Sequence, residues 1–432
     1  MPGITPFYVS HFTVFYPALW TIAWWLLARA PGYRVAIRDH RRYWIAALLF
    51  LILWGFASTT WAFMRATHPE VGWNTATQLA IAGLFALIVS CVKPPSSLLI
   101  LPLTAGILWN SAITIAQVAR QGAIGLSWLG EFPLSPTGTG MSILLAGDTR
   151  WLRPYGLLPH PNLLGGYFAI ALLTSAGWLF VRRRGIFLLG VGLVGGGFWA
   201  LLLTFSRGAW LGLFSGGLMA LLLLLRDLRR TSHLRIRLFF VILLLAVLAV
   251  LFALQYWPLL SARAGIGLER VELRSIADRV VYAQLAERAI REYPILGVGI
   301  GNFPWRAAYY LTETQFDLRG DNAHQTYLQI WAELGTIGLG LFLSLVVSGS
   351  WLFIRQWRGG YLSANRTLLF CAFIALAIIG LVDHYPWTIF HFQLAWFTCL
   401  AGCASPVTGE LARGTALDSR IPVGYNSRAH PA

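Results

Sequence analysis

Long hydrophobic segments separated by short polar connections recur along the whole chain. An α-helix rises 1.5 Å per residue, so about 20 apolar residues cross the hydrocarbon core of a membrane. The pattern predicts an all-α, polytopic membrane protein with about 11 (10–12) transmembrane helices. They are expected near residues 9–28, 44–64, 77–92, 97–117, 162–181, 186–203, 209–225, 238–257, 326–354, 367–383 and 388–405.

Composition supports one membrane domain without a separate soluble catalytic domain. Hydrophobic residues make up 57% of the chain and charged residues only 12%, against about 25% charged residues in soluble domains. We expect the membrane domain over residues 1–405, with its first span retained because no Lys or Arg precedes it. Residues 406–432 lack an apolar period and are predicted to be a disordered cytoplasmic tail.

The net charge of +16 is explained by membrane topology rather than by nucleic-acid binding. The basic residues lie in short connections and form no patch on a soluble face. Alternate connections and the tail hold 20 of the 33 Lys and Arg residues, and such basic connections are typically cytoplasmic. This places the N-terminus outside, the C-terminus inside and the loop 258–325 on the external face.

The loop 258–325 is predicted to contain an amphipathic helix. In "SIADRVVYAQLAERAIREYP" the residues Ile276, Val280, Ala283 and Ile290 recur at helical spacing, and Pro294 ends the pattern. The following "GVGIGNF" is expected to form a turn; it lacks the Lys-Ser/Thr ending of a phosphate-binding loop.

Polar segments at the ends of four predicted spans open onto the same external face. They are "RPYGLLPHPN" (153–162), "TFSRG" (204–208), "DNAHQ" (321–325) and "DHYPW" (383–387). Polar groups at span ends are costly unless they have partners, so these segments are candidates for a site. Supporting roles are expected for Arg153, Asn162, Asp321, Asn322, Glu333, Asp383 and His384.

Arg207 and Arg279 are the candidate anion-binding residues. A guanidinium group grips phosphate oxygens through paired N–H donors. Arg207 lies in a tight external link between two spans, and Arg279 lies on the predicted loop helix. Each also has a structural explanation: Arg207 as an interfacial residue that reaches the lipid headgroups, and Arg279 as part of a solvated helix face.

His324 is the candidate catalytic residue. An imidazole at a membrane surface suits a general base acting on a sugar hydroxyl, and Asp321 or Glu333 is positioned to orient it. The alternative is an interfacial histidine at a helix start. We expect no metal site, because His160, His384 and His391 show no close ligand spacing with His324.

The spaced motifs resemble the O-antigen ligase-like membrane glycosyltransferases, which include lipopolysaccharide O-antigen ligases and related polysaccharide polymerases. The resemblance rests on "RPYGLLPHPNLLGGYFA", "TFSRGAWLGL", "RVVYAQLAERAIREYPILGVGIGNF" and "AHQTYLQIWAELGTIG", in the family's order over residues 153–340. Two positions depart from the family pattern: Gln325 stands where Asn is usual, and Tyr282 stands near a usual Trp.

The resemblance implies transfer of a glycan from an undecaprenyl-diphosphate carrier to an acceptor hydroxyl on lipid A-core or another surface acceptor. The active site would face the periplasm from the bacterial inner membrane, and no metal, cofactor or nucleotide sugar would be needed. Arg207 and Arg279 would hold the diphosphate, and His324 would activate the acceptor. The implied partners are the lipid-linked donor, a glycan or lipid-linked acceptor and membrane lipids, with no nucleic acid.

Other functions remain open from the sequence. A polysaccharide polymerase would use the same donor with a different acceptor, and no sequence rule separates it from a ligase. A transporter or flippase of lipid-linked sugars would bind the diphosphate without chemistry, although such proteins usually show internal repeats and charges at mid-membrane. A structural scaffold would leave the external Arg and His residues unexplained.

Overall fold

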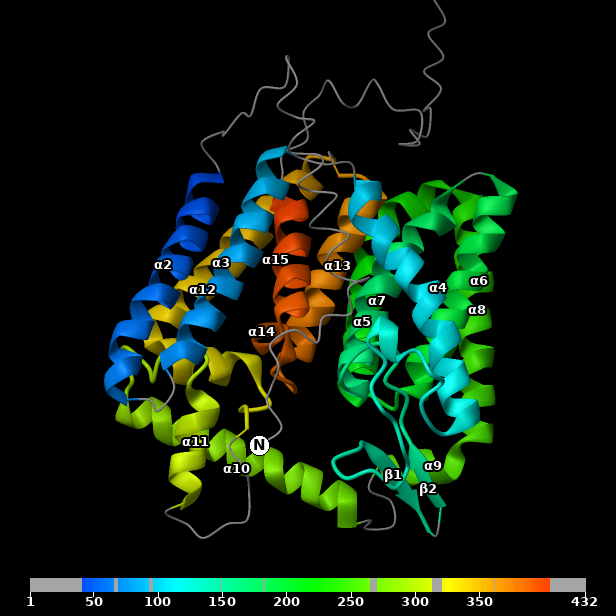
Figure 1. Ribbon diagram of the computed structural model, residues 1–432. Helices are drawn as coiled ribbons and strands as arrows, with labels where there is room; N and C mark the ends of the chain where they lie inside the picture. The colour runs from blue at the N-terminus through cyan, green and yellow to red at the C-terminus, as the bar shows by residue number, and fades with distance from the viewer. Residues whose placement is uncertain are drawn as a thin grey trace, which may run out of the picture.

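The computed structural model describes a bundle of helices that lie roughly side by side (Figure 1). The described residues are 41–65, 69–92, 96–147, 149–181, 183–264, 270–312, 321–360 and 362–404. The predicted first span (9–28) and the predicted tail (406–432) lie outside these ranges.

Eight helices of the described residues are long and apolar enough to cross a membrane. These are α2 (Arg42–Arg65), α3 (Pro69–Val92), α4 (Ser96–Arg120), α5 (Pro161–Ser175, continued by a 3-10 turn Ala176–Phe180), α6 (Arg184–Leu203), α7 (Arg207–Arg230), α8 (Ser232–Gln255) and α12 (Thr326–Arg358). Two shorter helices complete the bundle, α13 (Ala364–Ile379) and α15 (Phe390–Ala404). The mostly helical membrane fold is therefore confirmed, whereas the count of eleven spans and the external position of the loop 258–325 are not.

The helices differ in how much of their surface the protein itself covers. In α5, 78% of the span window is buried inside the protein, against 11% in α8. α8 is the most hydrophobic span, with exposed side chains such as Phe239, Phe240 and Leu254. Because exposed apolar surface is stable in lipid, α8 suits the outer face of the bundle and α5 its centre.

Short elements gather at one end of the bundle, the lower end in Figure 1. They are the antiparallel hairpin β1 (Ile143–Ala146) and β2 (Thr149–Leu152), α9 (Trp257–Arg263), α10 (Arg270–Glu292), α11 (Phe303–Thr312) and α14 (Tyr385–Thr388). The helix predicted from the loop pattern is α10, which begins earlier than the predicted segment and ends before Pro294. The pattern of apolar residues gave no sign of the hairpin.

The predicted "GVGIG" turn packs against a break in α12. The amide groups of Val298 and Gly299 donate to the carbonyls of Ala332 and Glu333, at 2.9 and 2.8 Å. Gly335 interrupts the helix with φ 66° and ψ −172°, a conformation that a side chain makes strained. The turn and the break therefore fit each other only because both are built on glycine.

Replacing Gly335 with alanine should destabilise the protein by about 3 to 5 kcal/mol. The added Cβ would overlap the carbonyl of Ile295 in a backbone conformation that alanine resists. Gly340→Ala on the same helix is the matched control, since a Cβ there meets nothing within 4 Å. In thermal unfolding in detergent, the midpoint temperature should fall strongly for Gly335→Ala and change little for Gly340→Ala. Equal midpoint temperatures in the two variants would contradict this account.

Candidate functional site

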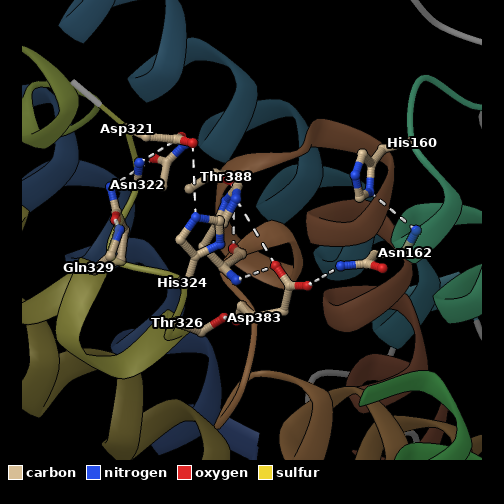
Figure 2. Close-up of polar contacts among 11 residues, drawn as sticks. His160, Asn162, Asp321, Asn322, His324, Thr326, Gln329, Asp383 and Thr388 are labelled. Atoms are coloured by element: carbon tan, nitrogen blue, oxygen red, sulfur yellow. Dashed lines mark hydrogen bonds and ion pairs between the residues drawn. The ribbon is translucent and has the colours of Figure 1, made fainter. Parts of the chain in front are cut away.

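His324 lies in the loop immediately before α12, with its backbone in the left-handed region at φ 50°. The next residue, Gln325, caps α12 by accepting a hydrogen bond from the amide of Leu328 at 2.6 Å. Figure 2 shows the His324 ring between Asp321 on one side and Asp383 on the other. The Nε2 atom of His324 is 3.7 Å from Oδ2 of Asp321. A strained, capped loop thus fixes where the imidazole points.

The loop before His324 is held by a buried chain of hydrogen bonds. The Gln329 side chain accepts from the amide of Ala323 at 2.8 Å and donates to Asn322 Oδ1 at 3.0 Å. It also donates to the Glu333 carboxylate at 2.8 Å, and that carboxylate accepts from the Trp387 indole at 3.1 Å. Glu333 is therefore linked to the loop that carries His324 through the Gln329 side chain.

A second histidine and a carboxylate meet His324 from the link between α13 and α14. The rings of His324 and His384 are 5.1 Å apart in an edge-on arrangement. His324, Asp383 and His384 present atoms of metal-ligand type within 4.8 Å of one another. The sequence argument against a metal site considered spacing along the chain, so it missed this convergence of segments about 60 residues apart.

Asp383 is tied to α5 and α12. Its Oδ2 accepts from the Asn162 side chain at 3.1 Å, and its backbone carbonyl accepts from the Thr326 hydroxyl at 3.0 Å. Asn162 in turn accepts from Arg153 through Oδ1 at 2.8 Å. The hydrogen bonds from Arg153 to Asn162 and from Asn162 to Asp383 therefore join two predicted site segments, 153–162 and 383–387 (Figure 2 labels Asn162 and Asp383).

Arg153 is buried, and each of its three guanidinium nitrogens donates a hydrogen bond to the protein. Besides Asn162, its guanidinium donates to the Thr204 carbonyl and to the Ser142 hydroxyl, both at 2.8 Å. Burial lowers the pKa of Arg153, and the charges of Arg279 and Arg207 act in the same direction. With its nitrogens engaged in this way, Arg153 positions the site and is poorly placed to grip a ligand.

Arg207 begins α7 and contacts a residue that the sequence analysis did not select, Arg263 at the end of α9. Arg207 donates to the Arg263 carbonyl at 2.8 Å, and the Arg263 side chain donates to the Phe205 carbonyl at 3.2 Å. Phe205, like His324, has φ 50°. Two hydrogen bonds thus join the strained link before α7 to α9. The guanidinium groups of Arg207 and Arg263 lie beside this link.

Arg279 reaches the same region from α10. One helical turn later on the same face, the Tyr282 ring packs 5.9 Å from the His324 ring. The positive charge of Arg279 disfavours the protonated forms of nearby basic side chains, namely Arg153, Arg207, Arg263 and His384. Arg279 is half-buried, and among the described residues no hydrogen bond or ion pair engages its guanidinium group.

The site is strongly cationic. Burial lowers the pKa of Arg263, and Arg153, Arg207 and Arg279 lower it further. Burial also lowers the pKa of His160 far below its ordinary value, and Arg153, His384 and His324 add to this effect. Buried like charges are costly unless an anion compensates them. The four arginines therefore favour an anionic ligand, next to a histidine that is fixed in place.

The structure brings together most of the residues predicted from the sequence. His324, Asp321, Asp383 and His384 form one group, and Arg153, Arg207 and Arg279 form the adjoining cationic group with Arg263. Asn162 bridges the two, while Asn322 and Glu333 support the His324 loop. Arg263 carried no distinguishing sequence signal because it was one of eight arginines in a long polar loop.

Comparison with known proteins supports the resemblance seen in the motifs. Residues 192–343, about a third of the chain, match the family model of the O-antigen ligase. The matched stretch contains Arg207, Arg263, Arg279 and His324, whereas Arg153, Asn162, Asp383 and His384 lie outside it. No curated protein matches the chain. Residues 192–343 are therefore similar to the O-antigen ligase family, and they lie in a chain whose apolar helices indicate a multi-pass membrane protein.

Proposed function

We propose that the protein is a metal-independent glycosyltransferase that moves a glycan from an undecaprenyl-diphosphate carrier to an acceptor hydroxyl. The acceptor is lipid A-core or another surface glycan or lipid, and the reaction takes place on the periplasmic face of the bacterial inner membrane. The observation that carries the proposal is that the group of His324, Asp383 and His384 adjoins a cluster of four arginines, to which Asn162 connects it.

The arginine cluster suits the diphosphate of a lipid-linked donor. Arg207 and Arg279 reach it from different elements, α7 and α10, and neither is fully buried. Guanidinium groups bind phosphate oxygens through paired donors and remain charged in poorly solvated sites. The apolar bundle would hold the polyprenyl chain, while the diphosphate would lie where the spans end.

His324 suits the acceptor side of the reaction. Its imidazole would take the proton of the acceptor hydroxyl while the hydroxyl oxygen bonds to the anomeric carbon of the donor sugar. The bond from that carbon to the diphosphate oxygen would break, and the diphosphate would leave with the electron pair. Preorganised arginines stabilise this developing negative charge best where water is scarce. General base catalysis contributes typically about 10²- to 10⁴-fold to a rate.

The decisive test is reconstitution of the purified full-length protein in liposomes. The donor would be an undecaprenyl-diphosphate-linked oligosaccharide of defined repeat number, offered with and without lipid A-core, and the products would be sized by mass spectrometry. We expect one glycan to move onto the acceptor, with release of one undecaprenyl diphosphate for each product.

Other products would identify the alternative functions. A ladder of repeat units made from the donor alone would show a polymerase that uses the same site. Donor binding without release of undecaprenyl diphosphate under any acceptor condition would contradict a transferase and favour transport of the lipid-linked sugar. A flipping assay with the same liposomes would then distinguish transport from binding alone.

A further inference from the structure

The group formed by His324, Asp383 and His384 has features that proton transfer alone does not require. Two imidazoles and a carboxylate present ligand-type atoms within 4.8 Å of one another. They come from two segments, the loop before α12 and the link between α13 and α14, which the Thr326 hydroxyl joins by donating to the Asp383 carbonyl. The three side chains are therefore held together by the backbone as well as by their own contacts.

The His384 ring is held in place by its own helix, as the ring of a metal ligand commonly is. Its Nδ1 atom is 2.6 Å from the Thr388 hydroxyl oxygen, and that hydroxyl donates its single proton to the His384 carbonyl at 3.3 Å. When the hydroxyl bonds to the carbonyl in this way, Nδ1 donates in the shorter contact and Nε2 of the neutral ring carries a lone pair. That lone pair lies on the side of Asp383, with Nε2 3.9 Å from Oδ1.

The Asp383 carboxylate is likewise oriented by outer contacts. Oδ2 accepts from Asn162 at 3.1 Å and Oδ1 accepts from the His384 amide at 2.9 Å, which leaves each oxygen a further lone pair. A histidine whose second nitrogen is hydrogen-bonded and a carboxylate held by its own partners are the usual surroundings of metal ligands.

We propose that His324, Asp383 and His384 form a binding site for a divalent transition metal ion, with Zn²⁺ as the best fit. Imidazole nitrogens select zinc, copper, nickel and iron, whereas Mg²⁺ and Ca²⁺ prefer oxygen ligands. Three protein ligands with a position left open are common for zinc outside purely structural sites. A second carboxylate, Asp321, lies beside His324, with its Oδ2 atom 3.7 Å from Nε2 of the imidazole.

Metal binding and base catalysis at this site exclude each other, a consequence that rests on the proposed function. A metal ion on His324 occupies the lone pair that would accept the hydroxyl proton. The metal-free protein is therefore the active form, and zinc is an inhibitor that competes for the catalytic histidine. Chelation of the ion should restore transfer.

The binding experiment needs neither donor nor acceptor. Full-length protein in detergent, stripped with a chelator, is titrated with Zn²⁺ against a chromophoric zinc indicator, and Co²⁺ absorption spectra report the ligands directly. We expect one zinc ion per chain at this site. His384→Ala should weaken zinc binding by at least about 100-fold, and Thr388→Ala, which keeps all three ligands, by about 10- to 100-fold.

The matched control is His233→Ala, which removes an exposed histidine from the start of α8. Zinc affinity should be unchanged in this variant, and millimolar Mg²⁺ should not compete. Absence of zinc binding in a wild-type protein that elutes as a single folded species, or unchanged affinity in both His384→Ala and Thr388→Ala, would overturn the proposal. Zinc binding by a protein that shows no transferase activity even after the metal is stripped would overturn only the proposed function.

Discussion

Replacement of His324 with alanine is expected to lower the rate of glycan transfer by about 10²- to 10⁴-fold, the usual contribution of a general base. The variant should still bind the donor, because the arginines that would hold the diphosphate lie on other elements, α7, α9 and α10. The measurement is the single-turnover rate with saturating acceptor in liposomes, together with donor binding by a sedimentation assay.

The fold should survive this change. His324 is partly exposed, and the bonds that secure its loop are made by Gln325, Gln329 and Thr326. His233→Ala on α8 serves as the control for loss of an unrelated histidine and should leave the rate unchanged. A His324→Ala protein that transfers glycan at close to the wild-type rate would remove His324 from the chemistry and leave the arginine cluster as a binding site only.

The sequence predicted the membrane helices well where hydrophobicity alone determines the structure. α8 is recognisable because it is apolar throughout and is barely covered by the protein. Counting spans is harder near the C-terminus, where α13 and α15 are shorter than a typical span and α14 lies between them. A hydropathy pattern does not separate a short buried helix from a spanning one, since both are equally apolar.

The sequence also predicted that the polar segments at span ends belong together, but not which atoms meet. Asp383 and His384 were selected as polar residues at a span end, yet their contact with His324 depends on how α13 and α14 pack against α12. Arg153 was selected for its motif, and only the structure shows that its guanidinium is used to hold Thr204, Ser142 and Asn162. Such pairings are tertiary, so no periodicity along the chain encodes them.

Backbone strain was the other feature hidden from the sequence. Phe205, two residues before Arg207, and His324 itself both adopt φ 50°. A positive φ is predicted from sequence at glycine, whereas here the neighbouring contacts impose it on bulky residues. This backbone strain occurs in the two links that position Arg207 and His324.

Arg279→Lys is expected to reduce transfer by about 10- to 100-fold, although the positive charge is kept. Lysine is a point charge and lacks the planar fork that binds two phosphate oxygens at once. A hydrogen bond to a charged group contributes about 1.5 to 3 kcal/mol, and 1.4 kcal/mol corresponds to a tenfold change in rate. The rate constant kcat should fall if Arg279 stabilises the departing diphosphate, whereas a rise in KM for the donor alone would indicate ground-state binding.

The control for Arg279→Lys lies on the same helix. Arg291 is 77% exposed and is paired with Glu287 across one turn of α10 at 3.7 Å, a surface contact of little energetic weight. Arg291→Lys should therefore transfer glycan at the wild-type rate with the same dependence on donor concentration. If the two variants behave alike, Arg279 is an ordinary surface charge of α10, and the diphosphate would have to be held by Arg207 and Arg263 without it.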